Sequence, residues 1–257
     1  MSAVAVVTGA AQGIGRRVAE VLAGRGYSLA LADLRVPAET LDAVREQGAT
    51  AFALVGDVSD EQYAANLTDR VLAEYGQVDA LVNNAGVSLL VPAENTTAEQ
   101  WRRVLDVNLT GPFLLSRAIG AAMLGAGTGS IVNIASIAGL HGVSDRAAYN
   151  ASKHGLIGLT RTLAAEWGGR GVRVNAVCPG WVKTEMDEAD QASGGYTDED
   201  IVGRVPMGRF ASPDDIAAAV AFLADPAASG FVNGVALPVD GGWTADASWD
   251  SLRLRKR

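Results

Sequence analysis

The 257-residue sequence contains few of the side chains that bind metals or form disulfides. It has one cysteine, Cys178, and two histidines, His141 and His154. A lone cysteine excludes an internal disulfide and favours a reducing compartment, so we expect the protein in the cytoplasm. The cysteine and histidines do not form a cluster with metal-ligand spacing, and we expect no metal site. Cys178 lies in the apolar run VRVNAVCP and is predicted to be a buried hydrophobic residue.

Excess positive charge and long apolar runs are also missing. The net charge is −8, so no surplus of Lys and Arg can neutralise phosphates, and we expect no nucleic-acid partner. We find no apolar run of about 18 residues, so no membrane partner is expected. The start, MSAVAVVTGA, lacks the basic region of a signal peptide and is predicted to be a strand.

The repeating unit of the chain is a short apolar run followed by a helical pattern. The runs do not alternate polar with apolar residues, which is typical of parallel strands buried on both faces. The sequence therefore predicts an α/β fold: a single-domain, Rossmann-type, doubly wound seven-stranded parallel sheet with helices on both faces. The expected strands are Ala3–Val7, Ser28–Ala32, Thr50–Val55, Ala80–Asn83, Ser130–Ile134, Arg173–Val177 and Val235–Val239. The expected helices are Ile14–Arg25, Gln62–Tyr75, Ala98–Met123, Ala147–Trp167 and Pro213–Leu223.

One segment, 183–210, interrupts this pattern with polar and glycine-containing sequence. It follows a strand, and ligands of open α/β sheets bind outside the carboxyl ends of the strands. We therefore expect a substrate lid, with a surface excursion as the alternative.

The stretch VVTGAAQGIG places Gly9, Gly13 and Gly15 between the first strand and the first helix. Glycines at such a turn let the backbone approach a pyrophosphate, which then lies on the helix N-terminus. Asp33 ends the second strand, where a carboxylate can accept hydrogen bonds from ribose hydroxyls and repel a 2′-phosphate. This arrangement favours NAD over NADP, although Arg35 could weaken the preference, and Asp33 could instead be a helix cap or turn residue.

Tyr149 and Lys153 stand one helical turn apart in AAYNASKHG. A free phenol titrates at about pH 10, and a nearby ammonium favours its ionised form. We expect Lys153 to acidify Tyr149, so that the phenol serves as a general base. Ser136 follows the strand SIVNIAS, and its hydroxyl would emerge at the same sheet edge, where it could bind a substrate oxygen.

Together, TGAAQGIG, NNAG at 83–86, Ser136 and YNASK resemble the short-chain dehydrogenase/reductase family over nearly the whole chain, from Ala3 to about Gly242. The resemblance implies NAD as cofactor and a homotetramer in which Ala98–Met123 and Ala147–Trp167 pack against other copies. It also implies that Asn83 supports the central sheet. The implied cofactor-binding residues are Gly9, Gln12, Gly13, Ile14, Gly15, Asp33, Asp57, Val58, Asn84, Ala85, Gly86, Tyr149, Lys153, Pro179, Gly180, Val182 and Thr184.

The same resemblance implies a catalytic set of Asn108, Ser136, Tyr149 and Lys153. Tyr149 would be the acid/base, Lys153 its pKa modulator and ribose anchor, Ser136 the holder of the substrate oxygen, and Asn108 the support of a proton relay. Asn108 could instead simply bend its helix before Pro112. The candidate substrate contacts are Ser136, His141, Arg146 and Trp181, with a surface role as the alternative for His141 and Arg146 and core packing as the alternative for Trp181.

The function predicted from these residues is NAD-dependent interconversion of a secondary alcohol and a ketone, with a polyol, sugar or hydroxy acid as small-molecule substrate. Arg146 suggests a carboxylate, whereas the apolar run GVSLLVPA would suit a hydrophobic ketone or a 3-oxoacyl group. A non-enzymatic NAD-binding sensor or scaffold is the alternative of another class. The C-terminal TADASWDSLRLRKR is predicted either to reach a neighbouring subunit or to fray.

Overall fold

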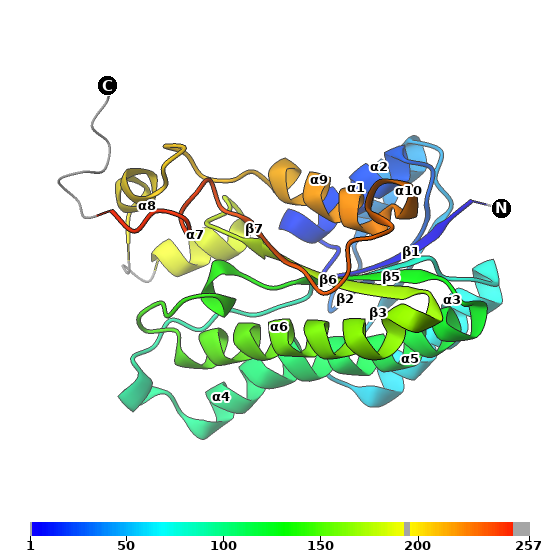
Figure 1. Ribbon diagram of the computed structural model, residues 1–257, viewed down its shortest axis with the longest axis horizontal. Helices are drawn as coiled ribbons and strands as arrows, with labels where there is room; N and C mark the ends of the chain where they lie inside the picture. Colours follow the sequence, from blue (N-terminus) through cyan, green and yellow to red (C-terminus); the bar gives the residue numbers. More distant parts are fainter. Residues whose placement is uncertain (1, 193–195, 249–257) are drawn as a thin grey trace.

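The computed structural model describes residues 2–192 and 196–248 and is built around one parallel sheet (Figure 1). Seven strands lie in the order β3-β2-β1-β4-β5-β6-β7, and every neighbouring pair is parallel. Strand order reverses between β1 and β4, which is the position where doubly wound folds bind ligands. The predicted fold class is thus confirmed. The strands are β1 Val4–Thr8, β2 Ser28–Asp33, β3 Ala51–Val55, β4 Ala80–Asn83, β5 Gly129–Ile134, β6 Val172–Pro179 and β7 Ala236–Val239.

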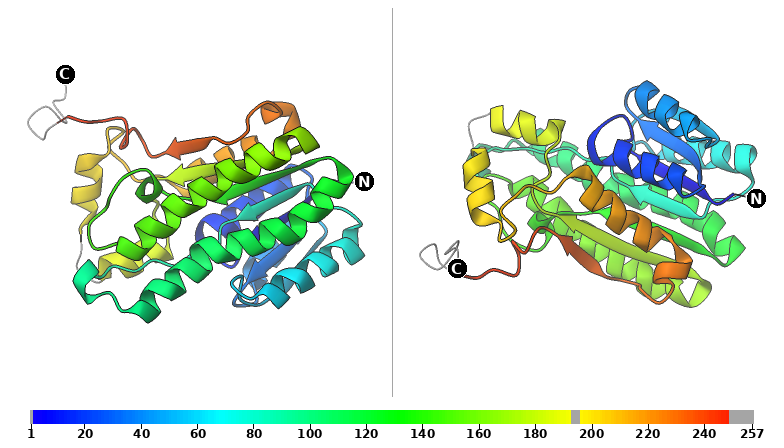
Figure 2. Two further views of the ribbon diagram at one scale, coloured as in Figure 1. Left: turned by 60° about the horizontal axis from the view of Figure 1, so that its bottom comes forward. Right: turned by 90° about the horizontal axis from the view of Figure 1, so that it is seen from above.

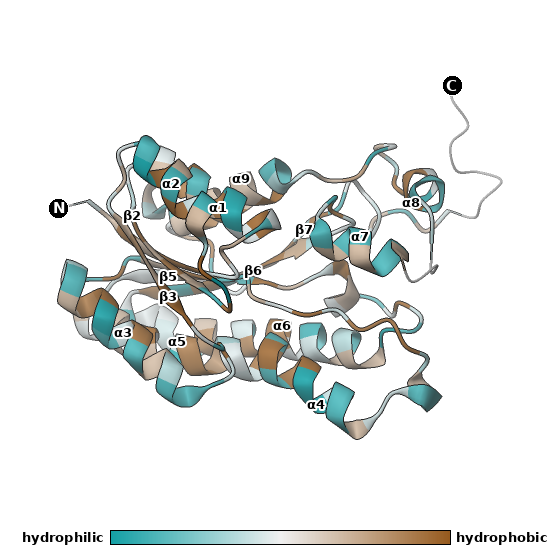
Figure 3. Ribbon diagram, turned by 180° about the vertical axis from the view of Figure 1, so that it is seen from behind, coloured by the Kyte–Doolittle hydropathy of each residue, from teal (hydrophilic) through white to brown (hydrophobic). Residues whose placement is uncertain are grey.

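Helices cover both faces of the sheet, as Figures 1 and 2 show. One face carries α1 Gly13–Gly24, α2 Ala38–Glu46, α9 Pro213–Ala224 and α10 Pro226–Ser229. The other carries α3 Glu61–Tyr75, α4 Ala98–Leu105, α5 Gly111–Ala126 and α6 Ala147–Trp167. Apolar side chains of the central strands alternate between the two layers, so each face has its own core. In Figure 3, α1 and α3 interleave hydrophilic and hydrophobic residues, as expected for helices with one buried side.

The starts of several helices follow from local capping chemistry. At α9, the Ser212 hydroxyl accepts a hydrogen bond from the backbone N–H of Asp215, and the Asp215 carboxylate accepts one from the Ser212 N–H. Pro213 occupies the first turn, where its missing N–H costs nothing. Thr97 and Gln100 form the same reciprocal pair at the start of α4. Short 3-10 turns occur at Ala93–Asn95, Ile137–Gly139 and Gly168–Arg170.

The helix predicted over Ala98–Met123 is continuous from Ala98 to Ala126 but contains a π-helical turn at Asp106–Thr110. Pro112 follows this turn, and a proline inside a helix lacks the N–H that an ordinary α-turn would use. By length and composition alone, this 29-residue helix could cross a membrane, a test that the core helix of a globular protein also passes. Here its inner side packs against α3, α6 and the sheet, which accounts for its apolar residues.

The predicted lid segment folds into two short helices, α7 Glu185–Ala192 and α8 Asp198–Arg204. The pattern predicted neither these helices nor α2, because each of them buries only one or two side chains. In Figure 1, α7 and α8 lie beyond the end of the sheet at which β6 leads into α7. The predicted C-terminal extension is described only to residue 248, and its basic end lies outside the described residues.

Candidate functional site

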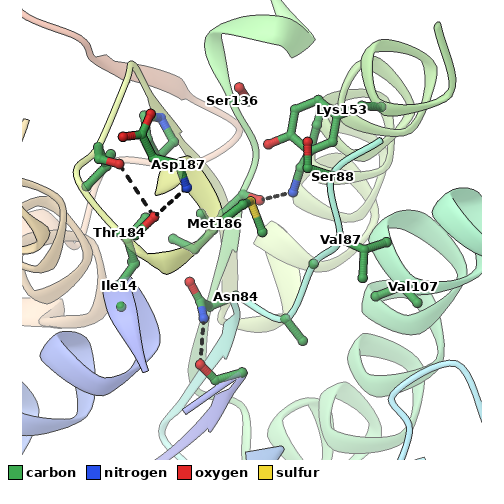
Figure 4. A pocket seen from close by; sticks show the side chains of 18 of the residues that line it. Ile14, Asn84, Val87, Ser88, Val107, Ser136, Lys153, Thr184, Met186 and Asp187 are labelled. Atoms are coloured by element: carbon green, nitrogen blue, oxygen red, sulfur yellow. Dashed lines mark hydrogen bonds between the residues drawn. The ribbon is translucent and has the colours of Figure 1, made fainter. Parts of the chain in front are cut away.

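A cavity of about 500 Å³ opens at the carboxyl edge of the sheet, and α7 borders one side of it (Figure 4). In the figure, Thr184, Met186 and Asp187 face Ser88, Val87 and Val107 across the cavity. The cavity brings together most of the predicted site residues. Those that line it are Gly9, Gln12, Gly13, Ile14, Asp33, Asp57, Val58, Asn84, Ala85, Gly86, Ser136, Arg146, Tyr149, Lys153, Pro179, Gly180, Trp181, Val182 and Thr184.

The glycine-rich turn between β1 and α1 is packed too tightly for larger residues. Gly9 has φ of +65°, and a Cβ there would lie 2.8 Å from Asn84 Nδ2. A Cβ on Gly15 would lie 2.0 Å from the Gly9 carbonyl oxygen, which explains why Gly15 does not itself line the cavity. Asn84 Nδ2 donates to the carbonyls of Thr8 and Gly9 at 2.9 and 3.1 Å. This leaves bare backbone and the N-terminus of α1 facing the cavity, a cradle suited to a pyrophosphate.

Asp33 lies at the end of β2, on the cavity wall. Its Oδ2 accepts a hydrogen bond from the Ala11 N–H at 2.9 Å, and its Oδ1 accepts one from the Arg35 N–H at 3.1 Å. These bonds fix the carboxylate where the second strand meets the glycine turn. The Arg35 side chain turns to Gln12 Oε1. The residues present therefore fit an adenine dinucleotide whose ribose faces Asp33.

Ser136 and Tyr149 meet at the inner end of the cavity. The Ser136 Oγ accepts from the Ala138 N–H at 3.1 Å, and Ser136 lies close enough to the Tyr149 phenol to lower its pKa. Ser136 follows β5, whereas Tyr149 lies in the first turn of α6, so the sheet edge and the helix start position the two hydroxyls. A substrate oxygen placed between them would contact both.

Lys153 is buried one turn below Tyr149. Its Nζ donates to the Ile134 carbonyl at 2.8 Å and lies 5.5 Å from the Tyr149 ring centroid (Figure 4). Burial lowers the pKa of Lys153 to about 8. Burial raises the pKa of Tyr149, and the Asp190 charge acts in the same direction, whereas the nearby Ser136 hydroxyl and the Arg146 charge act to lower it. Desolvation acts against both charged forms in this structure, so the acidification of Tyr149 by Lys153 and the oxidised nicotinamide stays a prediction.

Asn108 is fully buried inside the π-helical turn and does not line the cavity. Its Oδ1 accepts from the Val87 N–H at 2.8 Å, and its Nδ2 donates to the Val87 carbonyl at 2.9 Å and to Ser152 Oγ at 3.2 Å. The amide thus ties the chain that follows β4 to α6 beside Lys153. Nearby, Asn83 Nδ2 donates to Asn133 Oδ1 at 2.8 Å and joins β4 to β5, as expected of a residue that supports the sheet.

The loop after β6 carries Trp181, which packs in a cluster of aromatic side chains. Trp181 contacts Trp243 with centroids 5.6 Å apart and Tyr196 at 6.5 Å. His141, predicted to contact substrate, instead packs edge-on against Trp243 at 5.7 Å and is not among the cavity-lining residues. Cys178 is buried and burial raises the pKa of its thiol to about 11, as expected of a hydrophobic residue.

Arg146 lines the cavity as predicted, but two partners that the pattern did not reveal already bind it. Its guanidinium pairs with Asp190 at 2.8 Å and donates to Ser88 Oγ at 2.7 Å. Ser88 was hidden inside the apolar run after β4, and Asp190 inside the acidic lid. Neither residue lies in a motif, so only the fold brings them together. No group of three or more acidic, histidine or cysteine residues that could hold a metal ion is found within 2–192 and 196–248.

Comparison with known proteins shows which family shares this sequence and fold. A family model described as enoyl-(acyl carrier protein) reductase matches residues 9–244. The D-threitol dehydrogenase of Mycolicibacterium smegmatis is 45% identical over 94% of this chain and 92% of its own. The cis-4-hydroxycyclohexanecarboxylate dehydrogenase of Sinomonas cyclohexanicum is 42% identical over 94% and 96%. A crystal structure from Beutenbergia cavernae, described as a candidate NAD(P)-dependent gluconate 5-dehydrogenase with NADP bound at low occupancy, matches with TM-score 0.89 and 45% identity over 95% and 97%.

The chain belongs to the short-chain dehydrogenase/reductase family. It is an oxidoreductase that interconverts alcohols and ketones.

Proposed function

We propose that the protein oxidises a small hydroxylated substrate (a polyol, sugar or hydroxy acid) to a ketone with NAD, and that Tyr149 is the acid/base. The observation that carries this proposal is that Ser136 and Tyr149 line the same cavity as Asp33 and the glycine turn. The names of the two similar dehydrogenases, for threitol and for a hydroxycyclohexane carboxylate, support a secondary alcohol.

The coenzyme would supply the hydride acceptor or donor, which no side chain can provide. The chain's own residues bind and deprotonate the alcohol. Ser136 holds the reacting oxygen, and Tyr149 takes its proton during oxidation or donates one during reduction. Lys153, buried beneath the phenol, supplies positive charge that favours the phenolate when the amine is protonated. Asn108 fixes the chain after β4 against α6, which helps to hold the Tyr149 hydroxyl in place relative to Ser136.

NAD rather than NADP is favoured by the position of Asp33. Its carboxylate is held by two backbone N–H groups and faces the cavity, so it can accept from ribose hydroxyls but would repel a phosphate ester. Arg35 lies on the same wall, but its side chain is engaged by Gln12. The structure similar to this chain from Beutenbergia cavernae holds NADP, so the choice of coenzyme needs a direct measurement.

The assay for this function is NADH formation at 340 nm with a panel of secondary alcohols. Tyr149→Phe removes only the hydroxyl, and we expect it to lower kcat by about 10²- to 10⁴-fold, the range of general acid–base catalysis. The matched control is Tyr75→Phe, because the Tyr75 hydroxyl donates to the Leu29 carbonyl away from the cavity. Full turnover by Tyr149→Phe would refute the role of Tyr149. Coenzyme binding by a wild-type protein that turns over no alcohol would favour the sensor hypothesis.

We further propose that the protein is a homotetramer of the cytoplasm and that 183–210 is its substrate lid. Two separate faces expose large apolar side chains. Trp101 and Phe113 lie on α4 and α5, and Phe222 and Phe231 lie near β7 at the edge of the sheet. Two different self-complementary faces would generate two two-fold axes and hence a closed tetramer.

A further inference from the structure

Ser88, Arg146 and Asp190 form a closed hydrogen-bonded ring, here called the polar triad. Arg146 Nη1 donates to Ser88 Oγ at 2.7 Å, and Ser88 Oγ donates to Asp190 Oδ2 at 3.0 Å. Arg146 Nη2 completes the ring by pairing with the same Asp190 oxygen at 2.8 Å. The three residues come from the chain after β4, the start of α6 and the lid helix α7. All three line the cavity.

The backbone holds Arg146 firmly in this ring. The Val91 N–H donates to the Asp145 carbonyl at 2.8 Å, and Val91 and Arg146 form an isolated parallel bridge. Asp145 adopts a positive φ of 58°, which turns the chain into α6. The Arg146 residue is only 8% exposed, so its charge could not rely on water. A buried cation without a counter-charge is strongly unfavourable, and Asp190 supplies that counter-charge from within the protein.

The polar triad also lies beside the reacting group. The Arg146 guanidinium carbon is 6.0 Å from the Tyr149 ring centroid. The adjoining lid wall adds a second carboxylate, Asp187, which is 6% exposed and accepts from the Tyr196 hydroxyl at 2.9 Å. Asp187 is itself paired with Lys183 at 3.4 Å, so the lid wall carries an Arg146 charge and an Asp187 charge that are both compensated within the protein. Such a wall does not attract a negatively charged substrate.

We propose that the polar triad selects a neutral polyol over a hydroxy acid. This inference rests on the proposed alcohol oxidation and narrows its substrate class. A hydroxyl next to the reacting carbon can accept from an N–H of Arg146 and donate to Asp190, so it matches a ring that contains both a donor and an acceptor. A carboxylate can only accept, and it would have to displace Asp190 from Arg146. Asp190 therefore acts as a built-in carboxylate that occupies the place of an acidic substrate group.

The test compares threitol with threonate, which differ only in a terminal CH₂OH or carboxylate. Asp190→Asn keeps the shape of the ring but removes its counter-charge. We expect the wild type to favour threitol, and Asp190→Asn to raise the threonate:threitol ratio of kcat/KM by about 10- to 100-fold, the value of one hydrogen bond to a charged group. The change should appear mainly in KM. Glu188→Gln, an exposed charge removal on the same helix, is the control.

A double variant, Asp190→Asn with Arg146→Gln, removes both charges and should return the ratio towards the wild-type value. Binding of both compounds is also followed by the fluorescence of Trp181 and Trp243, so the inference is tested without turnover. Gain of threonate binding in Asp190→Asn supports the inference even if neither compound is oxidised, an outcome that would refute only the proposed function. Equal effects on both compounds, or the same ratio in Asp190→Asn and Glu188→Gln, would overturn it.

Discussion

Burial of Lys153 lowers the free energy of unfolding by an amount that depends on pH. Its pKa falls from 10.5 to about 8 because the side chain is buried. An unfolded chain therefore binds more protons than the folded one between these values, and the stability contributed by this group rises with pH. Relative to a neutral side chain, the buried lysine costs about 3 kcal/mol at pH 7 and about 1 kcal/mol at pH 10.

Replacing Lys153 by Met fills a similar volume without the charge. The variant loses the hydrogen bond to the Ile134 carbonyl at both pH values, so that loss cancels in the comparison. We expect the change in the free energy of unfolding caused by Lys153→Met to be more favourable at pH 7 than at pH 10 by about 2 kcal/mol. Urea denaturation of the coenzyme-free protein at the two pH values measures it.

Lys183→Met is the control for this experiment, because Lys183 is an exposed lysine that pairs with Asp198. Its pKa is raised by that partner rather than lowered. Its replacement should therefore not reproduce the gain of stability at pH 7. If Lys153→Met changes stability equally at both pH values, the amine is not desolvated in the folded protein, and our account of the site's electrostatics fails.

Three further predictions follow from the same cavity and surface. Asp33→Ser should lower the NAD:NADP ratio of kcat/KM by about 10- to 100-fold, measured at 340 nm, because it removes a charged hydrogen-bond acceptor; an unchanged ratio would assign coenzyme choice to other residues. Because the protein raises the pKa of Tyr149, alcohol oxidation should speed up as pH rises while ketone reduction slows, and a flat pair of pH–rate profiles would contradict this. Phe113→Asp should lower the mass measured by light scattering, because Phe113 is 42% exposed on α5; a tetramer that persists would exclude this face as an interface.

The strands and the catalytic hydroxyls could be predicted because their signals are local. Strand β1 is almost entirely apolar, and its predicted and observed bounds differ by one residue at each end. Tyr149 and Lys153 stand one helical turn apart in a short motif, and Ser136 directly follows a predicted strand, so local spacing indicates all three. By contrast, α2 buries only Thr40 and Val44, so its apolar periodicity is too weak to indicate a helix.

The partners of Arg146 could not be predicted in the same way. Ser88 and Asp190 are 102 positions apart, and they come together because the segments after β4 and β6 both leave the carboxyl edge of the sheet. The sequence shows Arg146 as a cation close to the catalytic tyrosine, which suggests a carboxylate substrate. The fold reverses that interpretation, because the cation is neutralised within the chain before any substrate arrives.

The electrostatics of the Tyr149–Lys153 pair illustrate the same limit. A helical spacing indicates that an ammonium lies near a phenol, but it does not indicate how much water either group loses. In the folded chain, desolvation moves both groups towards their neutral forms: the phenol retains its proton and the amine releases its proton more readily. These shifts favour the protonated phenol, the form that donates a proton during ketone reduction. Oxidation requires added positive charge, which Arg146 contributes and Asp190 partly cancels. The polar triad thus connects the choice of substrate to the direction in which Tyr149 most readily works.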